Sequence, residues 1–182
     1  GQIYGYSVIP KKIQLELESS KEHFEQTGRC LICDMLKEEM AFEKRVIMEN
    51  DDFAAVLPFF TEYPYGMYII SKNHRQNLTE MSDEEKTNLA KILKEVTGTF
   101  DALFDMKFPY MMCMHQSPVN SEDTSDYYHF HIEFFPPMRS KDKQKFNASS
   151  ETGAWAHCNP TAPEEKAQEL REAYVRYKEK NG

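Results

Sequence analysis

Residues 127–137 have the sequence YYHFHIEFFPP, and this stretch decides the expected fold. Its aromatic and β-branched residues predict a β-strand, which the two prolines end. Side chains of a strand alternate between its two faces, so His129, His131 and Glu133 are expected on the same face. Two imidazoles and a carboxylate are costly to bury unless they have partners. We therefore expect metal ligation or acid–base chemistry along this strand.

The size and composition of the chain indicate a globular protein. With 182 residues it is long enough for one well-buried domain, and its 40% hydrophobic and 13% aromatic residues argue against disorder. The net charge of −8 argues against a nucleic-acid binder or a protein that binds anionic membranes. The same charge does not argue against a small phosphorylated ligand held by a few local hydrogen-bond donors. No apolar run approaches the roughly 18 residues of a membrane span, and no signal-peptide pattern opens the sequence.

The cysteines indicate a reducing compartment. The chain has four of them, and two are spaced as Cys30-x-x-Cys33. This spacing suits a metal or redox role better than a disulfide framework. We therefore expect a cytoplasmic protein.

The pattern of apolar residues and turn signals predicts a single α+β domain over residues 1–182. A capping box at Ser82-Asp83-Glu84-Glu85 begins the longest helix, whose apolar stripe is core. Residues 139–145 are expected to form a basic loop, and residues 146–159 show little periodicity. We expect helices over residues 11–26, 30–42, 82–103 and 164–178, and strands over 2–9, 45–50, 53–60, 67–71, 110–115 and 127–135. This order favours a mainly antiparallel sheet with flanking helices.

The cysteine pair is half of a zinc site, for which imidazoles are the usual other half. His74 follows an expected strand, and His129 lies at the start of another. A set of Cys30, Cys33, His74 and His129 would be tetrahedral, closed and structural. A redox pair or two ordinary buried thiols are the alternatives.

A competing metal set consists of three imidazoles and one carboxylate, donors that suit zinc or iron. Its members are Glu16, His115, His129 and His131. Because the two sets share His129, we expect only one of them to be filled. The plainer interpretation leaves Glu16 as a solvated glutamate and His115 as a satisfied histidine at a strand end.

Several motifs in order resemble a known family. Residues 129–133 resemble the histidine-triad motif, with Glu133 in place of its third histidine. The sequence GQIY at residues 1–4, the motif FPY at residues 108–110 with HQSP at 115–118, and FFPP at residues 134–137 followed by Arg139-Ser140 resemble the C-terminal half of galactose-1-phosphate uridylyltransferases. This resemblance implies a histidine-triad fold with a mainly antiparallel sheet. It also implies zinc, or iron, as the metal.

The resemblance further implies a reaction. In this family a histidine of the N-terminal triad-type domain attacks the α-phosphorus of UDP-glucose, and galactose 1-phosphate then accepts the uridylyl group in a ping-pong scheme. By this resemblance the nucleophile would precede Gly1, and Gln2 would donate to the phosphate. Residues 1–10 would belong to the last strand of the N-terminal domain. The chain is therefore expected to be a C-terminal half without the nucleophile.

The resemblance also implies the substrate contacts and the assembly. The expected substrates are UDP-glucose or UDP-galactose and a hexose 1-phosphate, bound by a homodimer in which sugar-contacting residues reach the active site of the other subunit. By position these residues are Lys145, Phe146, Glu151 and His157. From chemistry alone Lys145 is an ordinary surface lysine. Residues 147–155 depart from the family pattern, which leaves the hexose open.

Three alternatives remain at this point. One is a nucleotide-sugar phosphorylase of the ADP-glucose type. Another is a stand-alone histidine-triad hydrolase with His131 as nucleophile, against which Glu133 in the third histidine position argues. The third is a zinc-bound dimerisation module without catalysis of its own.

Overall fold

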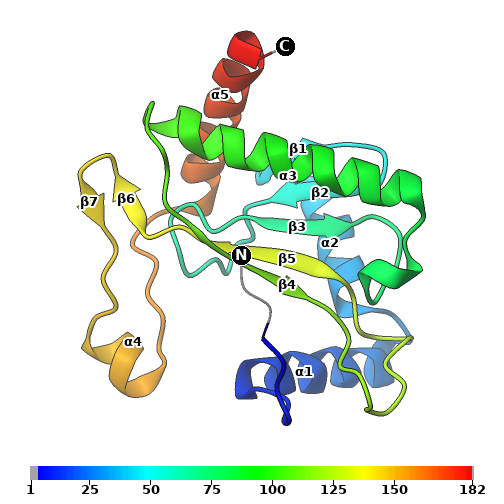
Figure 1. Cartoon of the computed structure of the whole chain (residues 1–182). Helices are drawn as coiled ribbons and strands as arrows, with labels where there is room; N and C mark the ends of the chain where they lie inside the picture. Colours follow the sequence, from blue (N-terminus) through cyan, green and yellow to red (C-terminus); the bar gives the residue numbers. More distant parts are fainter. Residues whose placement is uncertain (1–3, 182) are drawn as a thin grey trace.

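The computed structural model describes residues 4–181, which form one five-stranded antiparallel sheet with helices on both faces. The spatial order of the strands is β1-β2-β3-β5-β4, so β1 and β4 are the sheet edges (Figure 1). The strands are β1 (Val46–Glu49), β2 (Phe53–Val56), β3 (Tyr68–Ser71), β4 (Met111–His115) and β5 (His131–Phe135). The α+β class and the antiparallel sheet predicted from the sequence are confirmed.

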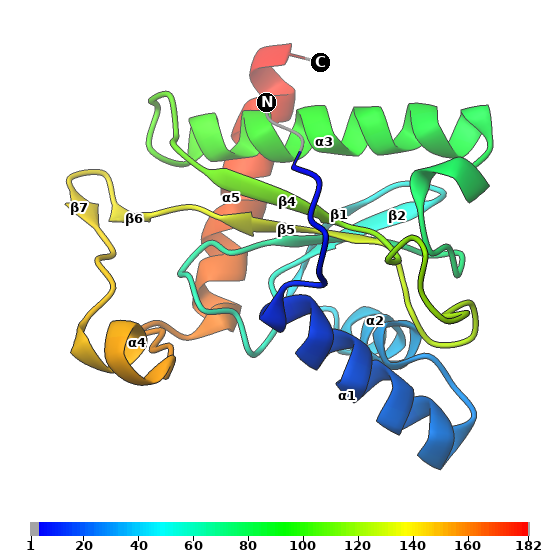
Figure 2. The same cartoon turned by 60° about the horizontal axis from the view of Figure 1, so that its bottom comes forward.

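Two pairs of helices cover the two faces of this sheet. Figure 2 shows α3 on one side and α1 with α2 on the other, and α5 packs against α3. The helices are α1 (Lys11–Thr27), α2 (Leu31–Phe42), η1 (Leu78–Glu80), α3 (Asp83–Leu103), α4 (Ser149–Ala154) and α5 (Pro163–Asn181). No helix in residues 4–181 is long and apolar enough to cross a membrane.

Alternation along the strands divides the core into two parts. In β2, Phe53 and Ala55 lie in the larger core together with residues of α3 and α5. Ala54 and Val56 point to the other face, where they pack with Leu36 of α2 in a much smaller cluster. Successive side chains of a strand must point to opposite faces, so a central strand with four buried residues requires a layer on each side.

The longest helix begins as predicted. The Ser82 hydroxyl accepts a hydrogen bond from the Glu85 backbone N–H, and the Glu85 carboxylate accepts one from the Ser82 backbone N–H. These two bonds satisfy donors that the first turn of a helix cannot pair internally. Because the signal is local, the sequence was sufficient to predict this helix start.

The strand predicted over residues 2–9 is absent from its described part. Residues 4–10 run without regular structure to α1, and Tyr6 and Val8 are exposed. Gln2 lies outside the described residues. A strand needs a neighbour to pair its N–H and C=O groups, and no strand of residues 4–181 pairs with this segment.

Other boundaries also differ from the sequence prediction. The strand expected over residues 53–60 ends at Val56. The strand expected from Tyr127 begins only at His131, because Tyr127 and Tyr128 donate their backbone N–H groups to the Thr124 carbonyl in a turn. The expected loop at 139–145 is instead a hairpin of β6 (Met138–Ser140) and β7 (Lys143–Gln144). Residues 138–159, which contain this hairpin and α4, are called the arm. Figure 1 shows the arm to one side of the sheet.

Candidate functional site

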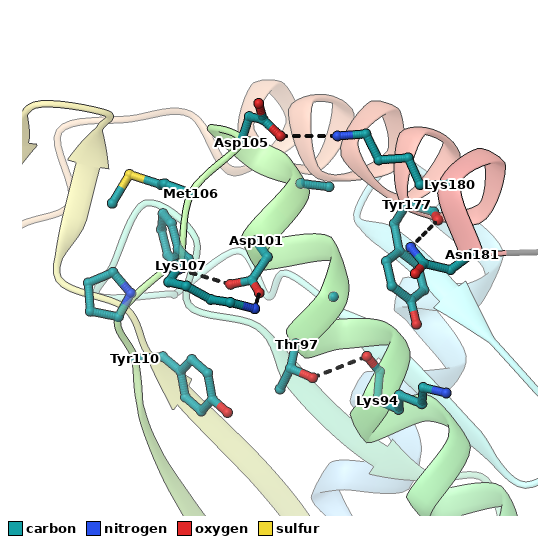
Figure 3. Close-up of a pocket in the computed structure, with 14 residues that line it drawn as sticks. Lys94, Thr97, Asp101, Asp105, Met106, Lys107, Tyr110, Tyr177, Lys180 and Asn181 are labelled. Atoms are coloured by element: carbon teal, nitrogen blue, oxygen red, sulfur yellow. Dashed lines mark hydrogen bonds and ion pairs between the residues drawn. The ribbon is translucent and has the colours of Figure 1, made fainter.

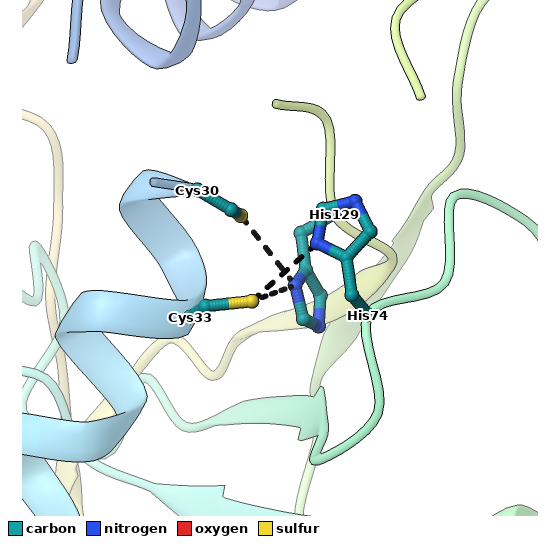
Figure 4. Close-up of side chains that lie close together, drawn as sticks. All are labelled: Cys30, Cys33, His74 and His129. Atoms are coloured by element: carbon teal, nitrogen blue, oxygen red, sulfur yellow. Dashed lines mark hydrogen bonds between the residues drawn. The ribbon is translucent and has the colours of Figure 1, made fainter. Parts of the chain in front are cut away.

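The first group of side chains contains two thiols and two imidazoles. Cys30 lies at the N-cap of α2, Cys33 in its first turn, His74 after β3 and His129 just before β5. Their possible ligand atoms all lie within 4.8 Å of one another, and Figure 4 shows the side chains pointing toward a common centre. The fold thus brings together three segments that are far apart in the sequence.

The spacing of the donor atoms fits a tetrahedral metal. The distance from Cys33 Sγ is 3.3 Å to His129 Nδ1 and 3.4 Å to His74 Nδ1, and Cys30 Sγ lies 3.7 Å from His129 Nδ1. With Zn–S bonds of about 2.3 Å and Zn–N bonds of about 2.0–2.1 Å, a tetrahedral site separates sulfur from nitrogen by about 3.5 Å. The donor set therefore fits zinc.

Hydrogen bonds on the far side of each ring orient the two imidazoles. His74 Nε2 lies 2.8 Å from the Ser125 carbonyl oxygen, and His129 Nε2 lies 2.9 Å from the Ser71 carbonyl oxygen. A carbonyl only accepts, so Nε2 carries the proton in both rings and the Nδ1 lone pair faces the thiols. These rings are held in the tautomer that binds a metal.

The two thiols interact closely, and together they favour one thiolate and one protonated thiol. The pKa of Cys30 is lowered, because Cys33 hydrogen-bonds to its sulfur and His129 and His74 add to this effect against burial. The pKa of Cys33 is raised by its hydrogen bond to Cys30, by burial and by the charge of the Cys30 thiolate. A second thiolate at this distance needs a cation to offset the repulsion, and a divalent metal would supply it.

A second group lies between α1 and the ends of β4 and β5. Glu16, His115 and His131 have possible ligand atoms within 4.8 Å of one another. Glu16 Oε2 is 2.8 Å from His115 Nδ1, and Glu16 Oε1 is 3.6 Å from His131 Nε2. His129, which the sequence placed in this set, has its ring in the first group instead. The structure thus separates the two sets, which do not compete for His129.

Glu133 lies beside this second group but is not one of its possible ligands. Its carboxylate oxygens lie 3.7 Å from His115 Nε2 and 3.6 Å from His131 Nε2. Lys12 Nζ lies 2.6 Å from Glu133 Oε2 and brings a cation to the group. The alternation along the strand had already placed Glu133 on the same face as His131, whereas nothing in the sequence pointed to Lys12.

Charge pairing dominates this second group. Burial raises the pKa of Glu133, but His131, His115 and Lys12 outweigh it, so the net pKa is lowered. Burial lowers the pKa of His131, but the carboxylates of Glu133 and Glu16 outweigh it, so the net pKa is raised. A buried histidine held between two carboxylates favours a proton or a metal ion at its Nε2.

The arm carries the four residues predicted to bind substrate. Lys145 is only 4% exposed and pairs with the equally buried Glu151, so it is not an ordinary surface lysine. Glu151 also accepts hydrogen bonds from the backbone N–H groups of Ala148 and Cys158. Lys145 and these two N–H groups lower the pKa of Glu151 to about 2.

The other two arm residues lie apart from this pair. Phe146 is 78% exposed, and His157 Nδ1 lies 3.4 Å from a carboxylate oxygen of Glu62. The structure therefore brings Lys145 and Glu151 together and leaves the Phe146 ring free for a contact outside the chain.

A pocket of about 860 Å³ lies elsewhere, between the C-terminal parts of α3 and α5 (Figure 3). Two of its lysines are already paired with aspartates of the same pocket. Lys107 lies 2.6 Å from Asp101, and Lys180 lies 3.0 Å from Asp105. None of its lining residues belongs to either group of metal-ligating side chains or to the arm. The pocket is therefore separate from the candidate site.

Known proteins match this chain over most of its length. The family model described as galactose-1-phosphate uridyl transferase, C-terminal domain, matches residues 16–179. A galactose-1-phosphate uridylyltransferase of Thermotoga maritima is 46% identical over 175 residues, which is 96% of this chain and 54% of that protein. The chain thus spans about half the length of the curated relatives that it matches.

Several solved structures also superpose on most of this chain. A uridylyltransferase structure superposes with a TM-score of 0.86 at 34% identity, over 93% of this chain and 52% of that one. An ADP-glucose phosphorylase of Arabidopsis thaliana, with ADP-glucose bound, superposes with a TM-score of 0.77 at 28% identity, over 91% of this chain and 50% of that one. A histidine-triad nucleotide-binding protein of Sulfolobus tokodaii has a TM-score of 0.60 at 18% identity over 84% of this chain and 97% of that one, which indicates a shared histidine-triad fold and nothing more.

Proposed function

Because the chain belongs to the galactose-1-phosphate uridyl transferase family by its C-terminal domain, we propose that it is the C-terminal half of an enzyme that exchanges UMP between UDP-glucose and galactose 1-phosphate. The observation that carries this proposal is the 46% identity to the Thermotoga maritima uridylyltransferase over 96% of the chain. In this proposal residues 1–182 form one domain of a two-domain transferase.

The proposed reaction runs through a uridylyl-histidine. A neutral imidazole attacks the α-phosphorus of UDP-glucose, the bond from that phosphorus to the glucose 1-phosphate oxygen breaks, and glucose 1-phosphate leaves. Galactose 1-phosphate then attacks the same phosphorus and releases the histidine. The nucleophile precedes Gly1 in this proposal, and Gln2 donates a hydrogen bond to the phosphate oxygens as charge develops on them.

The arm is proposed to contact the sugar phosphate. The exposed Phe146 supplies an apolar surface, and Lys145 would supply a cation if a sugar phosphate replaced its buried pairing with Glu151. Glu151 and His157 offer groups that bind sugar hydroxyls. We also propose that the enzyme is a cytoplasmic homodimer in which this arm completes the active site of the other subunit, an arrangement that the exposed Phe146 side chain supports.

We propose zinc as the metal of the first group, with Cys30, Cys33, His74 and His129 as its ligands. The distances and the tautomers support this choice. In this role zinc ties α2 to the ends of two strands and takes no part in the transfer. We also propose zinc or iron for the second group, with Glu16, His115 and His131 as its ligands.

The alternative functions are those of a nucleotide-sugar phosphorylase and of a histidine-triad hydrolase. The structural likeness to an ADP-glucose phosphorylase favours, as second candidate, phosphorolysis of a nucleotide sugar at the same site. A hydrolase with His131 as nucleophile is disfavoured, because the His131 side chain is only 2% exposed and lies against two carboxylates.

The test is turnover by the complete polypeptide that carries this domain. We expect glucose 1-phosphate release from UDP-glucose, followed by UDP-galactose formation when galactose 1-phosphate is added. ADP-glucose with orthophosphate is the competing substrate pair. If turnover with that pair is faster by tenfold or more, the phosphorylase replaces the uridylyltransferase as the assigned function.

A further inference from the structure

Three consecutive residues of the loop between β2 and β3 each contact the arm. The Thr61 carbonyl accepts a hydrogen bond of 3.0 Å from Asn159 Nδ2. Glu62 Oε2 lies 3.4 Å from His157 Nδ1. The ring of Tyr63 lies beneath the Lys145 ammonium, with 5.1 Å between the nitrogen and the ring centroid.

The loop that makes these contacts is held in one shape. The Thr61 hydroxyl lies 3.0 Å from the Tyr63 carbonyl oxygen and 2.9 Å from the Gly66 carbonyl oxygen, as a donor to both. A Cβ on Gly66 would lie 2.5 Å from Thr61 Oγ1, so this close approach requires glycine. The Tyr63 ring also packs edge-on against Phe135 at the end of β5, with the ring centroids 5.8 Å apart. The loop is therefore a rigid support joined to the sheet.

The arm itself has little that fixes its position. Of the arm residues that the structure describes, only Met138 belongs to a core cluster. The hairpin and α4 are short, at three, two and six residues. Elements of this size are not stable without tertiary contacts. The position of the arm therefore depends on its contacts with the rest of the fold.

We infer that Thr61, Glu62 and Tyr63 form a seat for the arm and act as positioning residues for Lys145 and His157. Lys145 is held from two sides, by the Glu151 carboxylate and by the face of the Tyr63 ring. An ammonium over an aromatic face is attracted by the ring quadrupole, and this attraction grows when water is excluded. The catalytic consequence of the inference rests on the proposed function, whereas the placement of the arm does not.

The single tryptophan of the chain makes this testable without an activity assay. Trp155 lies at the C-cap of α4 within the arm and is 72% exposed, so its fluorescence anisotropy reports the motion of the arm. Tyr63→Leu removes the ring face from beneath Lys145. Tyr63→Phe keeps the ring and removes only the hydroxyl, which makes it the matched control.

We expect Tyr63→Leu to lower the Trp155 anisotropy and to speed proteolytic cleavage in the arm by about two- to thirtyfold, the factor that a cation–π contact of this kind is worth. Tyr63→Phe should behave as the wild type. Both variants should keep the wild-type far-UV circular dichroism. If folded Tyr63→Leu shows the anisotropy and the cleavage rate of the wild type, the inference that the seat positions the arm is wrong.

If Tyr63→Leu does not fold, Glu62→Ala provides the second test, with Glu62→Gln as its conservative partner. Glu62→Ala should free His157 and speed cleavage on the C-terminal side of α4, and Glu62→Gln should restore protection. Equal cleavage in wild type, Glu62→Ala and Glu62→Gln would overturn the assignment of Glu62 to the seat.

The complete enzyme separates this inference from the proposed function. If the arm contacts the sugar phosphate, Tyr63→Leu should raise KM for hexose 1-phosphate more than it lowers kcat, and Tyr63→Phe should rescue KM. A loosened arm with unchanged kinetics would leave the seat standing and remove the arm from the proposed substrate site.

Discussion

Removal of the thiol of Cys33 should strip the first group of its metal and weaken one side of the fold. Cys33 Sγ faces both imidazoles at 3.3 and 3.4 Å, so Cys33→Ser deletes the donor that is central to the set. On this face α2 meets the sheet through a small buried cluster of Leu36, Ala54, Val56 and Ile70, against which partly buried residues such as Ile32 and Met35 pack. The much larger core lies on the other face. The metal is therefore expected to be a major part of what holds α2.

The size of the effect follows from linkage. Free zinc at 100–1,000 times its dissociation constant stabilises the folded chain by about 2.7–4.1 kcal/mol. For a chain of 182 residues, each kcal/mol shifts the melting temperature by about 2–4 °C. Chelation of the wild type, or the substitution Cys33→Ser, should therefore lower the melting temperature by about 5–15 °C.

Two measurements on the same samples check this prediction. Metal analysis should find about one zinc fewer per chain in Cys33→Ser than in the wild type, and chelator should no longer shift its melting temperature. Cys113→Ser is the matched control, because Cys113 is a free, exposed cysteine outside both groups. Unchanged zinc content in Cys33→Ser, or the same loss in Cys113→Ser, would refute the ligand set.

Two further predictions concern the loop and the arm. Gly66→Ala should lower the free energy of unfolding by about 1–3 kcal/mol in urea titrations, because the new Cβ would lie 2.5 Å from Thr61 Oγ1. Gly153→Ala is the control and should not destabilise the fold, because no atom lies within 4 Å of its Cβ position. The pKa of Glu151 is lowered to about 2 from 4.5, so its contribution is complete above about pH 4.5 and is lost as the pH falls toward 2. Trp155 anisotropy should fall over that range, and a loss that is already complete at pH 6 would contradict this.

Local signals in the sequence predicted the elements that depend on local chemistry. The capping box fixed the start of α3, and the spacing of Cys30 and Cys33 matched one turn at the start of α2. The segment 4–9 has the composition of a strand but no neighbouring strand in residues 4–181. The difference is physical, because a helix pairs its own backbone groups and a strand needs a second segment.

The sequence predicted only part of the candidate site. Residue types and strand ends were enough to group Cys30, Cys33, His74 and His129, since the Cys-x-x-Cys spacing is half of a zinc site and histidines at strand ends can complete it. Alternation failed for His129, because the rule holds only within a strand and β5 begins at His131. Lys145 and Glu151 pair because the chain between them turns back on itself. Nothing in the composition of residues 146–159 indicated this turn.

His129 joins the two groups through different atoms of one residue. Its ring faces the thiols, and its backbone carbonyl lies 2.9 Å from His131 Nδ1. Because a carbonyl only accepts, His131 carries a proton on Nδ1, and its Nε2 is left facing Glu16 and Glu133. The proposed zinc would therefore bind the same residue whose carbonyl sets the tautomer of His131. The short turn before β5 places the two groups side by side without either sharing a ligand.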